Sequence, residues 1–196
     1  KKTKRQIKAL ICVHVFGNSA KILDIKRICQ KYKIILIEDA AEALNSFYKK
    51  KHLGTFGEAG ILSFNGNKII STGGGGMILT NKKNYSKKSK YLTTVAKKNI
   101  KYQFIHGELG YNYRMPNLNA ALGCGQFENL DQMLKNKRVL AETYKNFFKS
   151  TEVQFFSEPD YALSNYWLNA VFFNDKDSKI KFLEESNDYG IGTRPI

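Results

Sequence analysis

Short apolar runs and one periodic segment fill the first forty residues of the chain. Residues 7–16 and 34–38 predict strands, and the second run is typical of a strand buried on both faces of a parallel sheet. Between them apolar residues recur with the 3.6-residue period of a helix, with Asn18 or Ser19 as its N-cap and its end near Lys33. This order predicts a parallel βαβ unit with a right-handed crossover.

Two further apolar runs flank a run of four glycines. Residues 59–64 and 77–80 predict strands, and residues 44–58 before them are rich in turn formers. The glycines at 73–76 exclude a helix and let the backbone fold back tightly. The connection between the two strands is short, which favours an antiparallel pair because a parallel return needs a long crossover.

The middle of the chain combines helical patterns with an aromatic loop. Residues 82–98 predict a lysine-rich helix, and we expect its inner side to carry Tyr85, Leu92 and Val95. The segment 99–115 is irregular and rich in aromatic residues, so it has much to bury or to bind. Pro116 fits the first turn of a long helix that reaches about Lys149 and has two candidate break points, Gly123 and Gly125.

The pattern changes after residue 150. Residues 153–156 and 166–173 alternate as strands do, and residues 177–186 have a helical pattern. We therefore divide the chain into an α/β domain over residues 1–150, with a mainly parallel sheet, and the start of a smaller α+β domain over residues 151–196.

Composition narrows the classes of function. With 42% hydrophobic residues, the chain can form a core. It has no apolar run of 18 residues, so we expect no membrane span. It also has no segment of the secretory type, so we expect a cytoplasmic protein. The net charge of +15 invites a nucleic-acid role, but the lysines are scattered over presumed helix faces, so we expect none. The three cysteines lack a pattern, which favours core filling in a reducing compartment over disulfides or a metal site.

Two strand ends carry candidate chemistry. Asp39 follows the run at 34–38, and the carboxyl ends of parallel strands are where ligands bind. Ser63 ends the run at 59–64, and Lys68 follows in a polar turn that can direct its amine into a cleft. A lysine with a free amine condenses with aldehydes, which is how pyridoxal phosphate is held. Asp39 as a cap of the next turn and Lys68 as a surface lysine are the alternatives.

Four sequence blocks, taken together, resemble one family. EDAAEA at 38–43 and SFNGNK at 63–68 are followed by GYNYRMP at 110–116, with NAA at 119–121 and Gln126, and VHVFG at 13–17 precedes them. In order and spacing they are similar to the DegT/DnrJ/EryC1/StrS family of pyridoxal-phosphate sugar aminotransferases. The amino-acid sequence of residues 63–76 is most similar to the branch that aminates a UDP-linked 4-keto-6-deoxy-N-acetyl sugar in legionaminic-acid biosynthesis.

The resemblance implies a fold and a role for several residues. It implies a fold-type-I enzyme, similar to aspartate aminotransferase, in which Lys68 binds the cofactor covalently and moves the proton during amino transfer. Asp39 would pair with the protonated pyridine nitrogen and must stay ionised to do so. Ser63 would donate to the cofactor phosphate. Glu42 stands where the family usually has glutamine near the ring oxygen, so it would be protonated, turn away or change the local chemistry.

Other family positions concern assembly and structure. Asn112 matches an asparagine that reaches the cofactor phosphate of the other subunit, which implies a homodimer with composite active sites. Its neighbour Arg114 would hold the loop, and His14 is at least as well explained by a structural role as by catalysis. The resemblance also implies that the family's phosphate loop and ring-stacking aromatic precede residue 1 and that the small domain continues beyond residue 196, so we expect a fragment.

The resulting functional prediction is amino transfer from an amino acid, with glutamate as the expected donor, to a keto group on a nucleotide-linked sugar used for surface polysaccharides. A sugar dehydratase of the same family is one alternative, but the resemblance gives that enzyme a histidine in place of Lys68. A non-catalytic regulator from the same family is the other. Neither the sugar nor its regiochemistry follows from the sequence.

Overall fold

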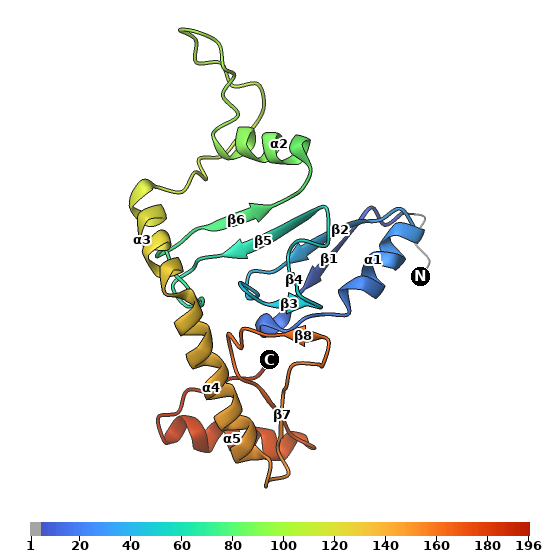
Figure 1. Ribbon diagram of the computed structural model, residues 1–196, viewed down its shortest axis with the longest axis vertical. Helices are drawn as coiled ribbons and strands as arrows, with labels where there is room; N and C mark the ends of the chain where they lie inside the picture. The colour runs from blue at the N-terminus through green and yellow to red at the C-terminus, as the bar shows by residue number, and fades with distance from the viewer. Residues whose placement is uncertain (1–4) are drawn as a thin grey trace.

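A four-stranded sheet forms the centre of the molecule in the computed structural model, which describes residues 5–196. Its strands, in spatial order, are β1 (Ala9–Val13), β2 (Ile35–Asp39), β5 (Ala59–Ser63) and β6 (Gly76–Leu79) (Figure 1). The first three strands are parallel, and β6 runs antiparallel to β5. The antiparallel return predicted from the short glycine-rich connection is therefore confirmed.

The βαβ unit forms as predicted, with shifted boundaries. Strand β1 ends at Val13 and a 3-10 turn, η1 (Val15–Gly17), follows before α1 (Ile22–Lys31). The predicted N-caps Asn18 and Ser19 are wrong, because Lys21 is the capping residue and those two side chains are buried instead.

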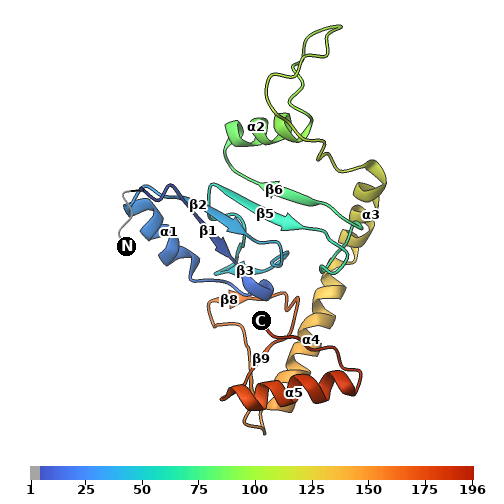
Figure 2. The ribbon, with the colours of Figure 1, turned by 180° about the vertical axis from the view of Figure 1, so that it is seen from behind.

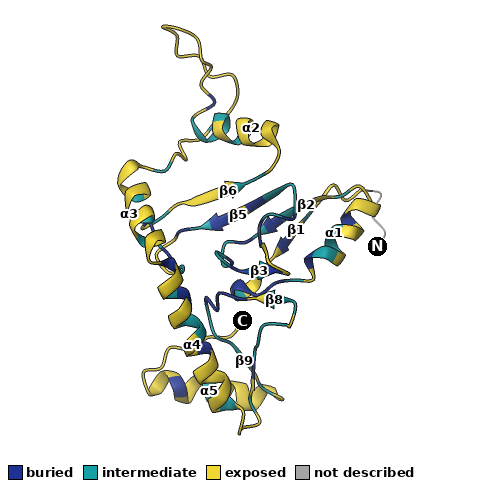
Figure 3. Cartoon of the chain, viewed as in Figure 1, coloured by how far each residue is buried: buried dark blue, intermediate teal, exposed yellow. Residues whose placement is uncertain are grey.

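One face of the sheet is buried and the other is open. Cys12, Leu36 and Leu62 point into the core, whereas Ile35 and Ile61 on the opposite face are 43% and 37% exposed (Figure 3). The expectation that residues 34–38 are buried on both faces is therefore wrong for this chain. The side chains of β2 alternate between the covered face and the open face of the sheet.

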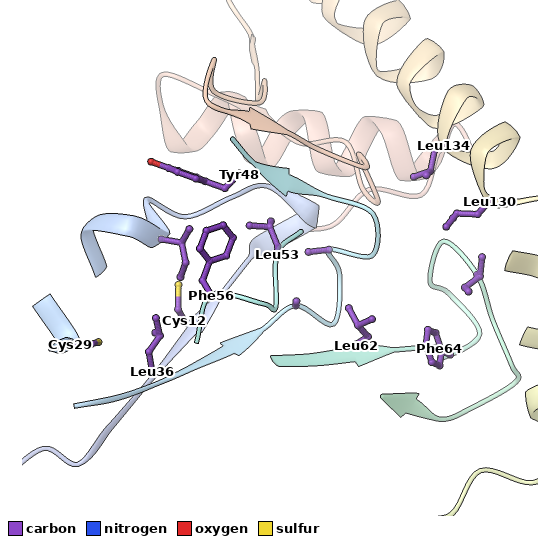
Figure 4. Packing of buried hydrophobic residues seen from close by; sticks show 14 residues of the cluster. Cys12, Cys29, Leu36, Tyr48, Leu53, Phe56, Leu62, Phe64, Leu130 and Leu134 are labelled. Carbon is purple, nitrogen blue, oxygen red and sulfur yellow. The ribbon is translucent and has the colours of Figure 1, made fainter. Parts of the chain in front are cut away.

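The core lies between the sheet, α1, a small second sheet and the start of α4 (Leu130–Phe148). Figure 4 shows Leu36, Phe56 and Leu53 packed together on the covered side, with Leu130 and Leu134 of α4 at its far end. The second sheet has the order β4-β3-β8, and its strands are β3 (Phe47–Tyr48), β4 (Lys51–His52) and β8 (Ala162–Leu163).

The cysteines follow the core-filling prediction only in part. Cys12 and Cys29 are buried in the core, but Cys124 is exposed on α3 (Asn117–Glu128). Burial, with Glu38 and Cys29 adding smaller effects, raises the pKa of the Cys12 thiol to about 11. A thiol of this kind packs as a small apolar side chain and is a poor nucleophile.

An extended arm, residues 83–116, leaves the body of the molecule after β6 (Figures 1 and 2). Helix α2 (Lys83–Thr93) ends before the predicted residue 98, because Val95 and Ala96 have positive φ angles of 59° and 49°. None of the residues of α2 is buried, so the predicted inner side of this helix is wrong. The irregular aromatic segment continues to residue 116.

The long helix predicted from Pro116 is two helices, α3 (Asn117–Glu128) and α4 (Leu130–Phe148). The break lies at Asn129 and not at a glycine, directly before two α4 leucines enter the core. Gly123 instead allows a close approach, since a Cβ there would meet the Thr72 methyl group at 2.8 Å.

The last part of the chain contains β7 (Gln154–Phe155), β9 (Val171–Phe172) and α5 (Lys176–Asp188). Strands β7 and β9 pair with each other, while β8 pairs with β3 of the first part. The domain boundary at residue 150 stays a prediction. Within residues 5–196 no helix is both long and apolar enough to cross a membrane, and no three His, Cys, Asp or Glu side chains gather as metal ligands.

Candidate active site

Two predicted site residues lie at the carboxyl edge of the central sheet. Asp39 is the last residue of β2 and Ser63 the last of β5. Because Asp39 pairs in register with Ile61 on the parallel neighbour, both side chains belong to the same edge. The Asp39 carboxylate accepts a hydrogen bond from the Ala41 amide at 3.1 Å, so the capping role considered from sequence is present and uses only Oδ1.

Lys68 lies in the turn that follows β5, and its amine faces a carboxylate. The Lys68 amide donates to the Asn65 carbonyl at 3.0 Å, which closes the turn. Its Nζ is 3.7 Å from Glu42 Oε1, and the two side chains are only 14% and 24% exposed. This partial burial strengthens the ion pair compared with one on an open surface.

Glu42 points toward Lys68 and is fixed by the backbone on its other side. Its Oε2 accepts a hydrogen bond from the Phe16 amide at 2.7 Å. Phe16 has a positive φ of 56° inside η1, and this conformation directs its N–H at the carboxylate. The sequence left open whether Glu42 is protonated, turns away or changes the local chemistry; in the structure its side chain is directed at Lys68.

Helix α3 holds the loop on which Lys68 lies. Gln126 Oε1 accepts a hydrogen bond from the Ser71 amide at 2.7 Å, and Asn119 Nδ2 donates to the Thr72 carbonyl at 2.5 Å. The Thr72 amide in turn donates to Phe64 O at 3.0 Å, which ties the loop back to the end of β5. Asn119 and Gln126 of the family-like block therefore hold the loop that carries Lys68, a role that the sequence alone did not indicate.

A segment from the end of the chain completes the surroundings of Glu42 and Lys68. Asn165 Nδ2 donates to the carbonyls of Glu42 and Leu44 at 2.8 and 2.9 Å, and Asn165 is 1% exposed. Trp167 follows, and its ring centroid is 3.9 Å from Lys68 Nζ. Neither residue was expected at the site from its sequence pattern, in which the one signal is that Trp167 is the single tryptophan of the chain.

A buried hydrogen-bonded pair, Glu38 and His14, lies next to Asp39, whose carbonyl accepts a hydrogen bond from the His14 amide at 3.0 Å. Glu38 and His14 are both 0% exposed, with His14 Nε2 3.1 Å from Glu38 Oε2. The His14 Nδ1 accepts a hydrogen bond from the Ala20 amide at 3.3 Å, which requires Nδ1 to be unprotonated and Nε2 to carry the proton. This supports the structural role for His14. Side chains alternate between the two faces of a strand, so Glu38 shares the buried face with Leu36 while Asp39 lies on the other face. This alternation was the sequence signal for a buried carboxylate at position 38.

The family match decides the classification. The DegT/DnrJ/EryC1/StrS aminotransferase family matches residues 1–196. The chain belongs to this family. The aminotransferase family expected from the four sequence blocks is thereby confirmed.

Individual relatives agree with this DegT/DnrJ/EryC1/StrS membership. The chain is 39% identical over 191 residues to the putative pyridoxal phosphate-dependent aminotransferase EpsN of Bacillus subtilis, covering 96% of the chain and 49% of that protein. It is 34% identical over 195 residues to GDP-perosamine synthase of Escherichia coli O157:H7, covering 100% and 53%. The chain thus spans about half the length of the curated relatives it matches. The finer prediction of a legionaminic-acid branch is not confirmed by these relatives.

The fold is also that of solved family structures. PseC of Helicobacter pylori, an aminotransferase involved in the biosynthesis of pseudoaminic acid, matches with a TM-score of 0.85 and 25% identity. The match covers 93% of this chain and 50% of PseC. Together with the parallel β1-β2-β5 arrangement, this confirms the predicted α/β fold of fold-type-I enzymes.

Asn112 is the one predicted site residue that the structure does not bring to the others. It lies on the arm, exposed, where it forms a bridge with Thr94, and the arm extends away from the sheet edge (Figures 1 and 2). Tyr111 and Tyr113 stack on each other at 5.1 Å on either side of it. Arg114 follows on the same exposed segment.

Proposed function

We propose that the protein containing this chain is a pyridoxal-phosphate-dependent aminotransferase that acts on a keto group of a nucleotide-linked sugar, with glutamate as the amino donor. The observation that carries the proposal is the partly buried Lys68 amine facing Glu42, next to the strand ends that carry Asp39 and Ser63. The family membership and the likeness to GDP-perosamine synthase support the substrate class.

The described residues fit the chemical parts of pyridoxal phosphate. A lysine amine, a carboxylate with one oxygen not engaged by Ala41 and a hydroxyl come from one sheet edge. When bound, this cofactor supplies an aldehyde for an amine and an electron-withdrawing ring. Lys68 would hold the aldehyde carbon, Asp39 the pyridine nitrogen, Ser63 the phosphate and Glu42 the polar side of the ring.

The protein's own contribution to the reaction is proton movement and charge. Lys68 Nζ takes a proton from the donor's α-carbon and returns it to a neighbouring carbon, which requires the neutral amine at that moment. The Asp39 carboxylate would hold the pyridine nitrogen of the bound cofactor, where a negative charge favours the protonated ring. Glu42 is within reach of Lys68 Nζ and can hold the amine when it is protonated.

A direct assay tests the function. The full-length protein, with pyridoxal phosphate, glutamate and a nucleotide-linked 4-keto-6-deoxy sugar, should produce 2-oxoglutarate and the amino sugar in equal amounts. Mass spectrometry would follow the replacement of the keto oxygen by an amine. Deoxygenation of the sugar without amine gain would identify a dehydratase, and no turnover with any keto sugar would favour a regulatory protein.

The arm supports a composite active site in a homodimer. Tyr102, Phe104 and Tyr113 on the arm are 88%, 80% and 72% exposed, which is a large apolar surface for an isolated subunit. Aromatic side chains of this kind are enriched at protein interfaces. We therefore propose a two-fold dimer in which Asn112 of one subunit completes the phosphate site of its partner.

Mixing two inactive variants tests this dimer. Lys68→Ala and Asn112→Ala, in full-length form, are each expected to be impaired, but a heterodimer has one site with both defects and one with neither. When equal amounts of the two variants exchange at random, about half of the dimers are heterodimers. Each heterodimer has one intact site of two, so about one quarter of all sites should be active. Activity would be measured after subunit exchange has been shown with differently tagged subunits.

A same-chain pair is the matched control for the mixing experiment. Lys68→Ala mixed with Asp39→Ala should restore nothing, because every site then keeps one defect. If the Lys68→Ala and Asn112→Ala mixture also restores nothing although subunits exchange and Asn112→Ala alone is impaired, Asn112 acts within its own chain.

A further inference from the structure

The indole of Trp167 lies against the Lys68 amine, and the proposed chemistry gives it no role. Lys68 Nζ lies 3.9 Å from the ring centroid, and Trp167 is 5% exposed. An ammonium over an indole face is attracted by the ring quadrupole, more strongly when the pair is shielded from water. The amine is thus held from two directions, by this ring and by Glu42 at 3.7 Å.

The orientation of the indole is fixed by contacts that do not involve Lys68. Trp167 Nε1 donates to the Asn67 carbonyl at 2.7 Å, and the Trp167 amide donates to Asn165 Oδ1 at 2.9 Å. The Phe16 ring packs near it, with a centroid distance of 6.2 Å. The ring therefore has its own fixed contacts apart from the lysine, which is what a positioning group requires.

We propose that Trp167 is the positioning residue of Lys68: its indole face and the Glu42 carboxylate together hold the lysine as an ammonium at the sheet edge until the cofactor binds. The inference rests on the proposed function for its purpose, but the contact itself exists without cofactor. It also assigns a site role to the last part of the chain, 99 residues beyond Lys68.

Reductive methylation of the cofactor-free protein measures this contact. Formaldehyde condenses with a neutral amine, water leaves, and hydride from cyanoborohydride reduces the resulting C=N bond, so the labelling rate reports the free and accessible amine. Peptide mass spectrometry would give the rate at Lys68 relative to Lys135, which is exposed. We expect Trp167→Leu to raise the relative rate about 2- to 30-fold, the range that corresponds to cation–π energies.

Two controls distinguish loss of the Trp167–Lys68 contact from a general loss of structure around Trp167. Trp167→Phe keeps an aromatic face and loses only the Nε1 donor, so its Lys68 rate should stay close to that of the parent. Lys137 Nζ donates to the Trp167 backbone carbonyl at 3.3 Å, a contact that Trp167→Leu leaves intact. An unchanged Lys68 rate in Trp167→Leu, or an equal rise at Lys137, would overturn the proposal.

A measurement on the unsubstituted protein keeps the proposal testable even if Trp167→Leu does not fold. The indole ring current should shift the Lys68 ε-methylene proton resonances upfield of the other lysines, with the assignment made by Lys68→Met. Resonances at the ordinary position would overturn the proposal. Neither measurement uses pyridoxal phosphate, so a failure of the proposed function would show only in the amino-transfer assay.

Discussion

Lys68→Ala is expected to lower kcat/KM for amino transfer by at least about 10²–10⁴-fold in the full-length protein, because it removes the group that moves the proton and binds the aldehyde. The fold should persist. Lys68 lies in a turn whose closing hydrogen bond uses its backbone amide, and that amide remains in the alanine variant. Steady-state kinetics would give the rate, and circular dichroism with thermal unfolding would verify the fold.

Lys51→Ala is the matched control for this experiment. Lys51 also lies over an aromatic ring, with Nζ 4.6 Å from the centroid of Phe56, but it is exposed and belongs to β4 of the second sheet. Its removal should leave kcat/KM within about threefold of the parent. Turnover by Lys68→Ala equal to that of Lys51→Ala would remove Lys68 from the mechanism.

Glu38→Ala is expected to reduce the free energy of unfolding by about 3–5 kcal/mol, because it leaves buried donors without an acceptor. Glu38 accepts hydrogen bonds from the amides of Gly54, Phe56 and Gly57 at 2.8, 2.5 and 2.6 Å, in addition to His14. Urea unfolding would measure the loss. Substitution of the exposed Glu128 by alanine should change the same quantity by less than about 0.5 kcal/mol.

The same carboxylate gives the stability a defined pH dependence. Burial alone would raise the pKa of Glu38, but the hydrogen bonds from His14, Gly57 and Gly54 outweigh it and lower the pKa below 4.5. A carboxyl with a depressed folded-state pKa stabilises the fold fully above its unfolded value. This contribution should be lost as the pH falls from 4.5 through the folded pKa.

Glu38→Gln isolates this contribution, since it keeps the shape and removes the titrating group. The parent protein should lose more of its unfolding free energy than Glu38→Gln does between about pH 6 and about pH 3. Parallel pH profiles for the two proteins would show that Glu38 is not the group responsible.

The carboxyl edge could be predicted from sequence because its signals are local. An apolar run that ends in Asp39 and another that ends in Ser63 specify two strand ends, and the parallel arrangement brings them to one edge. The polar turn with Lys68 follows after five residues. Each of these features depends on neighbours a few positions away, which is the range over which periodicity carries information.

The remainder of the site depends on contacts between distant segments. Asn165 bonds to carbonyls more than 120 residues earlier, at Glu42 and Leu44, and Trp167 meets Lys68 across 99 residues. No local pattern encodes such packing. The helix predicted over 82–98 forms but ends early, at Thr93, because Val95 and Ala96 have positive φ angles that oppose the preferences of both residues.

Covalent capture of the cofactor tests the central claim most directly. The full-length protein would be mixed with pyridoxal phosphate and reduced with borohydride, which fixes the cofactor to the amine that holds it, and the modified peptide would be identified by mass spectrometry. The proposed site predicts about one cofactor per chain, on Lys68. Modification at a different single lysine, or spread over the surface lysines with Lys68 unmodified, would contradict it.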